Sequence, residues 1–184
     1  MDERDWSLSS EDLNASRKRR GSKALELTSP AFSDGGEIPR ECGYKNGNQE
    51  PPLRIGVVGG KELGSTGVGS LALIMDDPDA MEAVGKVWVH WVAWNIDPTN
   101  TELENLTIVG MTDFGEVGYG GPAPPDKRHT YVFTLYALDS ELPEVLDNTS
   151  TTADLFEAMA GNAWDTPASD HVIERTRLKG TYAP

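Results

Sequence analysis

Residues 87–96 read VWVHWVAWNI, and this stretch decides the fold. Apolar side chains stand at both odd and even positions, so a strand formed by these residues would be covered on both faces. The segment Tyr131–Leu138 has the same character. These two segments are therefore predicted to be the central strands of a sheet that forms the core of the protein.

On either side of this core, short segments of β character alternate with clusters of Gly, Pro, Asn and Asp. This spacing is typical of an all-β sandwich. The further predicted strands are Ala24–Leu27, Pro52–Val57, Ser70–Met75 and Val172–Tyr182.

One helix is clearly indicated. Thr151 is predicted to cap it, because Asp154 follows at the spacing of a capping box. A weaker helix or turn is predicted over Asp79–Val84. The clear helix would cover the sheet from outside with one apolar side, formed by Leu155, Phe156 and Met159.

The length of the chain fits one domain. Its 184 residues suffice for a single well-buried core, which is expected over residues 24–184. Residues 1–23 are polar, include the basic run Arg17–Arg20 and have no period that would bury a face. This composition predicts a disordered N-terminal arm.

The composition also limits the class of partner. The chain has 30 acidic and 16 basic residues, and this net charge of -14 argues against a nucleic-acid partner. We interpret the acidity as adaptation to high salt (a halophilic protein), with a cationic partner as the alternative. Cys42 is the single cysteine, so no intrachain disulfide can form, and the N-terminus lacks the apolar segment of a secretory signal. No apolar run approaches the roughly eighteen residues that span a bilayer, so we expect a cytoplasmic protein that is not integral to a membrane.

Polar residues interrupt the apolar pattern in three places. The run Asp76–Asp79 ends a predicted strand, which Pro78 would stop. His90 lies inside the apolar stretch, and strand alternation predicts that it shares a face with its neighbours at even positions. Those neighbours are Trp88, Val92 and Trp94.

The third place is the loop Gly118–Pro125, which His129 follows. Its glycines would let backbone amides approach a ligand closely. Each of the three features also has a purely structural alternative: turn-forming carboxylates, a buried neutral histidine and an ordinary wide turn. Nucleotide-binding glycine motifs and the common hydrolase motifs are missing from the sequence, so no catalytic residue is predicted.

In their order and spacing, these segments resemble the phosphatidylethanolamine-binding family, especially its bacterial and archaeal Raf kinase inhibitor-like branch. The resemblance extends from about Leu25 to Tyr182. It rests on SPAF (29–32), GG (35–36), Cys42, PPL (51–53), SLALIMDDPDA (70–80), HWVAWNI (90–96), DFG (113–115), GYGGPAPP (118–125), HTYVFTLYALD (129–139) and GTY (180–182).

The resemblance implies a mainly β fold, an antiparallel β-sandwich with a few peripheral helices. It also implies a pocket for phosphate-type anions or phospholipid head groups, in which two histidines face each other as donors and carboxylates orient them. Amides near Gly121 would add further donors. The ligand-binding residues that it implies are Asp77, Asp79, His90, Gly121, Pro122, His129 and Tyr131.

Three departures from the family pattern bear on this pocket. Thr130 stands where the family usually has Arg, and Arg128 precedes His129 instead. Met81 replaces a usual proline, and the connection from 125 to 129 is short. The chain ends at Pro184 without the C-terminal helix of the animal proteins, so we expect a more open pocket.

The expected function is the binding of an anionic small molecule, with a regulatory role and without turnover, because the pocket offers donors but no evident nucleophile. One alternative is a hydrolase that uses the same Asp and His side chains to hold a metal ion or to act as acid and base. Another, implied by eukaryotic relatives that regulate kinases or proteases, is a protein inhibitor or scaffold. No cofactor or resident metal is expected, and the bacterial members suggest a homodimer.

Overall fold

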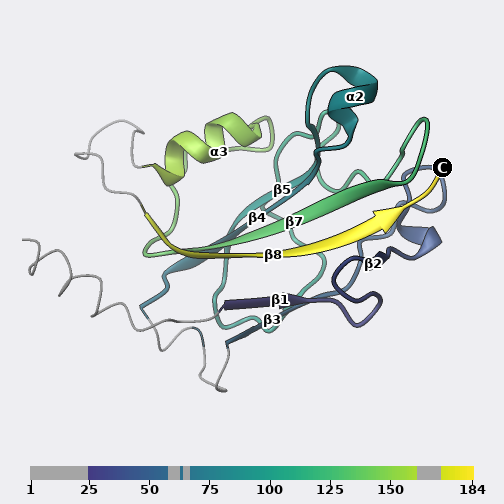
Figure 1. Ribbon diagram of the computed structural model, residues 1–184. Coiled ribbons are helices and arrows are strands. Elements are labelled where there is room, and N and C mark those ends of the chain that lie inside the picture. Colours follow the sequence, from purple (N-terminus) through teal and green to yellow (C-terminus); the bar gives the residue numbers. More distant parts are fainter. Residues whose placement is uncertain (1–24, 58–62, 64–66, 161–170) are drawn as a thin grey trace, which may run out of the picture.

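The computed structural model describes residues 25–57, 63, 67–160 and 171–184. The predicted arm, residues 1–23, lies outside the described residues. Within them, the protein forms two facing sheets with helices at the periphery (Figure 1), which confirms the predicted mainly β sandwich.

The smaller sheet has three antiparallel strands in the order β1-β3-β6. They are β1 (Leu25–Thr28), β3 (Leu53–Val57) and β6 (Glu102–Leu103).

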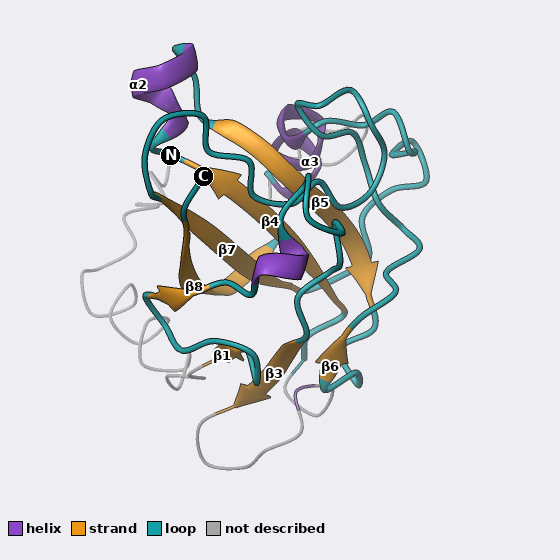
Figure 2. Ribbon diagram, turned by 90° about the vertical axis from the view of Figure 1, so that its right-hand side faces the viewer, coloured by secondary structure: helices purple, strands orange, loops and turns teal. Residues whose placement is uncertain are grey.

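The larger sheet has five strands in the order β2-β8-β7-β4-β5, and Figure 2 labels the last four of them. Its pairs are antiparallel except for β2 and β8, which pair in parallel over two residues. The strands are β2 (Gly36–Glu37), β4 (Ser70–Asp77), β5 (Trp88–Ile96), β7 (His129–Leu138) and β8 (Val172–Tyr182). The short strands β2 and β6 were not predicted, whereas the six longer ones lie where the sequence pattern placed them.

Apolar layers cover both faces of the larger sheet. One layer fills the space between the two sheets and includes Leu73, Phe133 and Leu27. The other lies under α3 (Thr152–Met159) and includes Ile74 and Leu155. Successive residues of β4 therefore contribute to different layers, as the alternation of side chains along a strand requires.

The helices begin or end at residues that favour helix termini. Thr151 and Asp154 form the predicted capping box at the start of α3, and Phe156, although half-exposed, packs edge-on against Tyr136. The shorter α2 (Ala80–Val84) ends at Gly85, whose φ of 79° is readily adopted by glycine. A 3-10 turn, η1 (Arg40–Cys42), precedes β3.

The prediction that residues 87–96 form a central strand is wrong, because β5 is the last strand of the larger sheet. Residues 108–120 cover its outer edge instead. The amides of Gly110 and Asp113 donate to the carbonyl oxygens of Val92 and Val89, at 2.9 and 3.0 Å. This loop takes the place of a neighbouring strand at the edge, while the two apolar layers cover both faces of β5 as they do those of an inner strand.

Among the described residues, no helix is long and apolar enough to cross a membrane.

Candidate ligand-binding site

A small pocket opens at the end of the larger sheet where β4 finishes and β5 begins. Its volume of about 160 Å³ is below the roughly 300–1,000 Å³ of typical drug-sized sites, so it suits a small chemical group. Its walls are mostly apolar, with two polar side chains. It is lined by Asp77, Ala80, Ala83, Val84, Trp88, His90, Phe114, Ala123 and Pro125.

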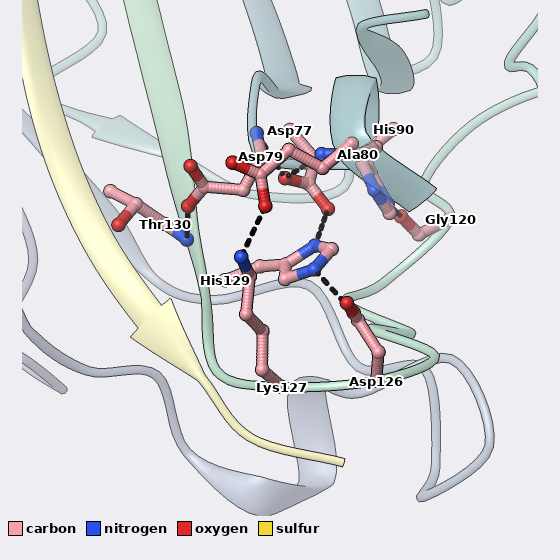
Figure 3. Close-up of polar contacts among 10 residues, drawn as sticks. Asp77, Asp79, Ala80, His90, Gly120, Asp126, Lys127, His129 and Thr130 are labelled. Carbon is pink, nitrogen blue, oxygen red and sulfur yellow. Dashed lines mark hydrogen bonds and ion pairs between the residues drawn. The ribbon is translucent and has the colours of Figure 1, made fainter. Parts of the chain in front are cut away.

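Asp77 is the last residue of β4 and is only 3% exposed. Its Oδ1 accepts hydrogen bonds from the amides of Asp79 and Ala80, at 3.0 and 3.1 Å. Its Oδ2 lies 2.7 Å from Nδ1 of His129 (Figure 3). The turn after Pro78 thus supplies two backbone donors that fix this carboxylate before it meets the histidine.

His129 begins β7 and is completely buried. Its Nδ1 contacts Asp77, and its Nε2 lies 2.9 Å from Oδ1 of Asp126. Burial lowers the pKa of His129, but the hydrogen bonds to the two carboxylates outweigh it and raise the pKa above its ordinary value. The ring is therefore held as an imidazolium that donates from both nitrogens.

His90 sits opposite a register shift between β4 and β5. Met75 pairs with Trp91 and Asp76 pairs with Val89, so His90 has no partner on β4. This bulge turns its ring toward Tyr131, with 5.1 Å between ring centroids, in the layer between the sheets.

The prediction that His90 shares a face with Val92 and Trp94 is consequently wrong, because those two residues belong to the layer under α3. Trp88, the remaining member of that predicted set, lines the pocket together with His90. The extra residue of the bulge accounts for the difference, since it moves the histidine out of strict alternation.

The ring of His90 has a defined tautomer. Its Nδ1 lies 2.6 Å from the carbonyl oxygen of Gly120, which can only accept, so Nδ1 carries the proton. Burial lowers the pKa of His90 despite this hydrogen bond and the charge of Asp77. In the neutral ring, Nε2 is therefore an acceptor.

Tyr131 brings a hydroxyl into the same region. The residue is completely buried, and Oη has no hydrogen-bond partner in the part of the chain that the structure describes. Burial and the nearby charge of Asp77 raise the pKa of Tyr131, so the hydroxyl keeps its proton. The hydroxyl lies near the carboxylate of Asp77 and the backbone of Ala123, two residues that line the pocket, but forms no hydrogen bond of good geometry with either.

Gly121 and Pro122 serve a different local purpose from the predicted one. The amide of Gly121 donates to Oδ1 of Asn48 at 2.7 Å, and the carbonyl of Pro122 accepts from the amide of Tyr44 at 2.9 Å. A Cβ on Gly121 would lie 2.0 Å from the carbonyl oxygen of Cys42. Glycine is thus required for close packing against residues 42–44, and its amide is already used.

Asp79 also acts on the backbone. Its Oδ2 accepts from the amide of Thr130 at 2.7 Å, which ties the turn before α2 to the start of β7. Arg128 contacts Glu37 and Thr181, at 3.4 and 3.3 Å, and so does not substitute at the pocket for the arginine that Thr130 replaces. The half-exposed Met81 lies on α2.

Sequence reasoning missed two residues of this site, Asp126 and Asn48. Asp126 had a usable signal, because it lies three residues before His129 and directly after the loop Gly118–Pro125. Asn48 had none, since its contact with Gly121 joins segments 73 positions apart.

Two other groups of reactive residues lie outside this pocket. At the opposite end of β7, Nδ1 of His171 lies 2.7 Å from Oδ1 of Asp139 and 3.2 Å from Oγ of Ser140. Both partners share one nitrogen, which differs from a catalytic triad, where they occupy opposite nitrogens. Burial, with the charge of Glu41, raises the pKa of the Cys42 thiol to about 11, which disfavours the reactive thiolate. Among the described residues, no three His, Cys, Asp or Glu side chains are grouped to hold a metal ion.

The sequence is similar to a known family over most of its length. A family model described as "Phosphatidylethanolamine-binding protein" matches residues 28–183. A UPF0098 protein of Chlamydia pneumoniae is 37% identical over 164 residues, which cover 86% of this chain and 98% of the relative. A UPF0098 protein of Methanothermobacter thermautotrophicus is 38% identical over 168 residues, with coverages of 86% and 98%.

Two crystal structures are similar in fold. One, of a putative phosphatidylethanolamine-binding protein homologue from Chlamydia trachomatis, is 35% identical with a TM-score of 0.72 and covers 88% of this chain and 98% of its own. The other, of Escherichia coli YbcL, is described as a new member of the mammalian family. It is 28% identical with a TM-score of 0.68, and the coverages are 86% and 97%. Sequence and fold thus agree over nearly all of the described chain.

Proposed function

Because the chain belongs to the phosphatidylethanolamine-binding protein family, we propose that its pocket binds a small ligand that carries a phosphate-type anionic group. The observation that carries this proposal is the buried hydroxyl of Tyr131, which lies near the carboxylate of Asp77 but makes no hydrogen bond of good geometry with the described residues. A buried polar group left unpaired costs roughly 1–3 kcal/mol, and such groups in native proteins commonly have a functional reason. A phosphate oxygen would supply the missing acceptor.

The two histidines would complement this hydroxyl in different ways. His129 is a charged donor, and charge-assisted hydrogen bonds are among the strongest that proteins make with phosphate oxygens. His90 presents Nε2 as an acceptor, so it suits a ligand that still carries one acidic proton. At lower pH the ring of His90 would itself become charged and donate.

The apolar walls would select what is attached to the anion. Trp88, Phe114 and Pro125 line the pocket beside the polar groups. An apolar group next to the phosphate would pack on these side chains. We therefore propose a phosphate monoester or a head group of comparable size as the ligand class.

The experiment is a calorimetric titration of inorganic phosphate and phenyl phosphate into wild type, Tyr131→Phe and Tyr136→Phe. A hydrogen bond to a charged group is worth roughly 1.5–3 kcal/mol, so Tyr131→Phe is expected to bind about ten- to a hundredfold more weakly. Tyr136 lies on the same strand in the layer under α3, and its matched substitution should leave affinity unchanged. The proposal fails if neither phosphate compound binds the folded wild type, or if both variants lose affinity equally.

A further inference from the structure

The loop 122–128 places a carboxylate against the nitrogen of His129 that faces away from Asp77. Oδ1 of Asp126 lies 2.9 Å from Nε2 of His129 (Figure 3). The histidine is completely buried, whereas the side chain of Asp126 is 48% exposed. Desolvation raises the pKa of Asp126, but the hydrogen bond from His129 outweighs it and lowers the pKa overall, so this carboxylate stays ionised.

Nε2 of His129 carries a single N–H and makes one strong hydrogen bond at a time. It is also the ring nitrogen left to a ligand, because Asp77 holds Nδ1. We infer that Asp126 is an internal competing anion, which a phosphate-type ligand must displace from His129 and which makes the site selective for anions. This inference rests on the proposed function and adds the residue that sets its affinity and selectivity.

The exchange requires only a rotation of the Asp126 side chain. Pro122, Pro124 and Pro125 restrict the backbone on one side of Asp126, and Lys127 forms an ion pair with Glu82 of α2 on the other. The prolines are the main restriction on the loop, because the ion pair is exposed and contributes little. The partly exposed carboxylate can turn into solvent and be hydrated, so the movement does not bury the charge of Asp126 itself.

The selectivity for anions follows from the partners that His129 keeps after Asp126 has turned away. If Asp126 turned away without a replacement, the buried imidazolium of His129 would keep only Asp77 as a partner, and an uncompensated N–H would be left in a low-dielectric site. A neutral ligand supplies no negative charge there. An anion supplies both the charge and the acceptor, so only an anion replaces Asp126 without loss.

The test titrates inorganic phosphate into wild type, Asp126→Ala, Asp126→Asn and Glu116→Gln at fixed neutral pH and ionic strength. Asp126→Ala is expected to bind at least about fivefold more tightly, a ratio within the usual range of coupling between two binding events. Asp126→Asn should gain less, because its amide oxygen still accepts from His129. Glu116 is exposed, two residues from the pocket residue Phe114, and controls for the loss of one negative charge near the site.

Nitrogen NMR of the histidine rings gives a second readout. Phosphate should shift the His129 Nε2 signal of the wild type toward that of phosphate-bound Asp126→Ala. Two results would overturn the exchange and leave the proposed function in place. One is equal phosphate affinity in the wild type and Asp126→Ala. The other is a gain in phosphate affinity in Glu116→Gln as large as that in Asp126→Ala. If phosphate binds neither the wild type nor the two Asp126 variants, the proposed function fails and the exchange falls with it.

Discussion

Asp76 and Asp77 are adjacent on β4, yet they point to opposite faces of the five-stranded sheet. Asp77 faces the pocket and accepts from two amides and from His129. Asp76 is on the α3 face, where burial, offset mainly by the charge of Arg177, raises its pKa to about 6. The two side chains thus differ in burial and in partners: Asp77 is buried and accepts three hydrogen bonds, whereas Asp76 is only partly buried and accepts none from the described residues.

This difference distinguishes the carboxylate at the pocket from the one on the α3 face. A buried carboxylate with good donors is held in one orientation, whereas a buried carboxylate with few partners mainly costs free energy of folding. The pocket end of the sheet has the organised carboxylate. The predictions below test that contrast.

The largest effect is expected from Asp77→Ala. It would leave the buried imidazolium of His129 with one carboxylate and two amides without their acceptor. Breaking a buried ion pair by removing one partner costs about 3–5 kcal/mol, so the free energy of unfolding should fall by that order. Urea denaturation followed by tryptophan fluorescence measures it, and a loss below about 1 kcal/mol, as for a surface pair, would contradict the assigned network.

Asp76→Asn is expected to raise the free energy of unfolding instead of lowering it. Folding raises the pKa of Asp76 from 3.8 to about 6, so the ionised side chain destabilises the folded state as pH rises through that window. After a discount for its partial exposure, the substitution should stabilise the protein by about 1–2 kcal/mol near pH 7. The gain in the free energy of unfolding should vanish below pH 3.8, where the side chain is protonated in both states. Urea denaturation near pH 7 and below pH 3.8 measures it. A gain that is independent of pH would argue against ionisation as the cause.

Substitutions of His129 and His90 should change the free energy of unfolding less, with pH dependences of opposite sign. Folding raises the pKa of His129, so its charge contributes stability that is complete below about pH 6.5 and is lost as pH rises through the folded value. His129→Gln should therefore cost more at acidic than at alkaline pH. Folding lowers the pKa of His90, so His90→Gln should cost less at acidic pH. Denaturation curves across this range measure both, and parallel profiles would show that the assigned charge states are wrong.

Asp139→Ala should have the smallest effect. The distance from Asp139 to Nδ1 of His171 is 2.7 Å, the same as from Asp77 to His129, but its side chain is 50% exposed. Exposed pairs contribute about 0–1 kcal/mol, so the loss should stay within that range. A loss comparable to that of Asp77→Ala would mean that geometry, and not burial, sets the value of these pairs.

Local sequence signals were sufficient for most of the fold. The longer strands follow apolar patterns, and α3 follows from Thr151 and Asp154, because capping depends on residues three apart. Asp77, His90 and His129 lie at one end of the larger sheet, and their role in ligand binding stays a prediction.

Features that depend on contacts between distant segments could not be predicted. The bulge at His90 arises from pairing with β4, and alternation within β5 alone points the ring to the wrong face. The amide of Gly121 is taken by Asn48, which no local pattern reveals. The edge position of β5 could not be predicted, because residues 108–120 form hydrogen bonds along its outer edge as a neighbouring strand would.

That loop, residues 108–120, has a consequence for behaviour at high concentration. An apolar ribbon such as β5 with an open row of amides and carbonyls would be a template for pairing between molecules. The loop occupies part of this row, so β5 is kept from pairing with the same strand of another molecule. Damage to residues 108–111 of the loop, away from the pocket residue Phe114, should therefore appear first as self-association, which light scattering would detect.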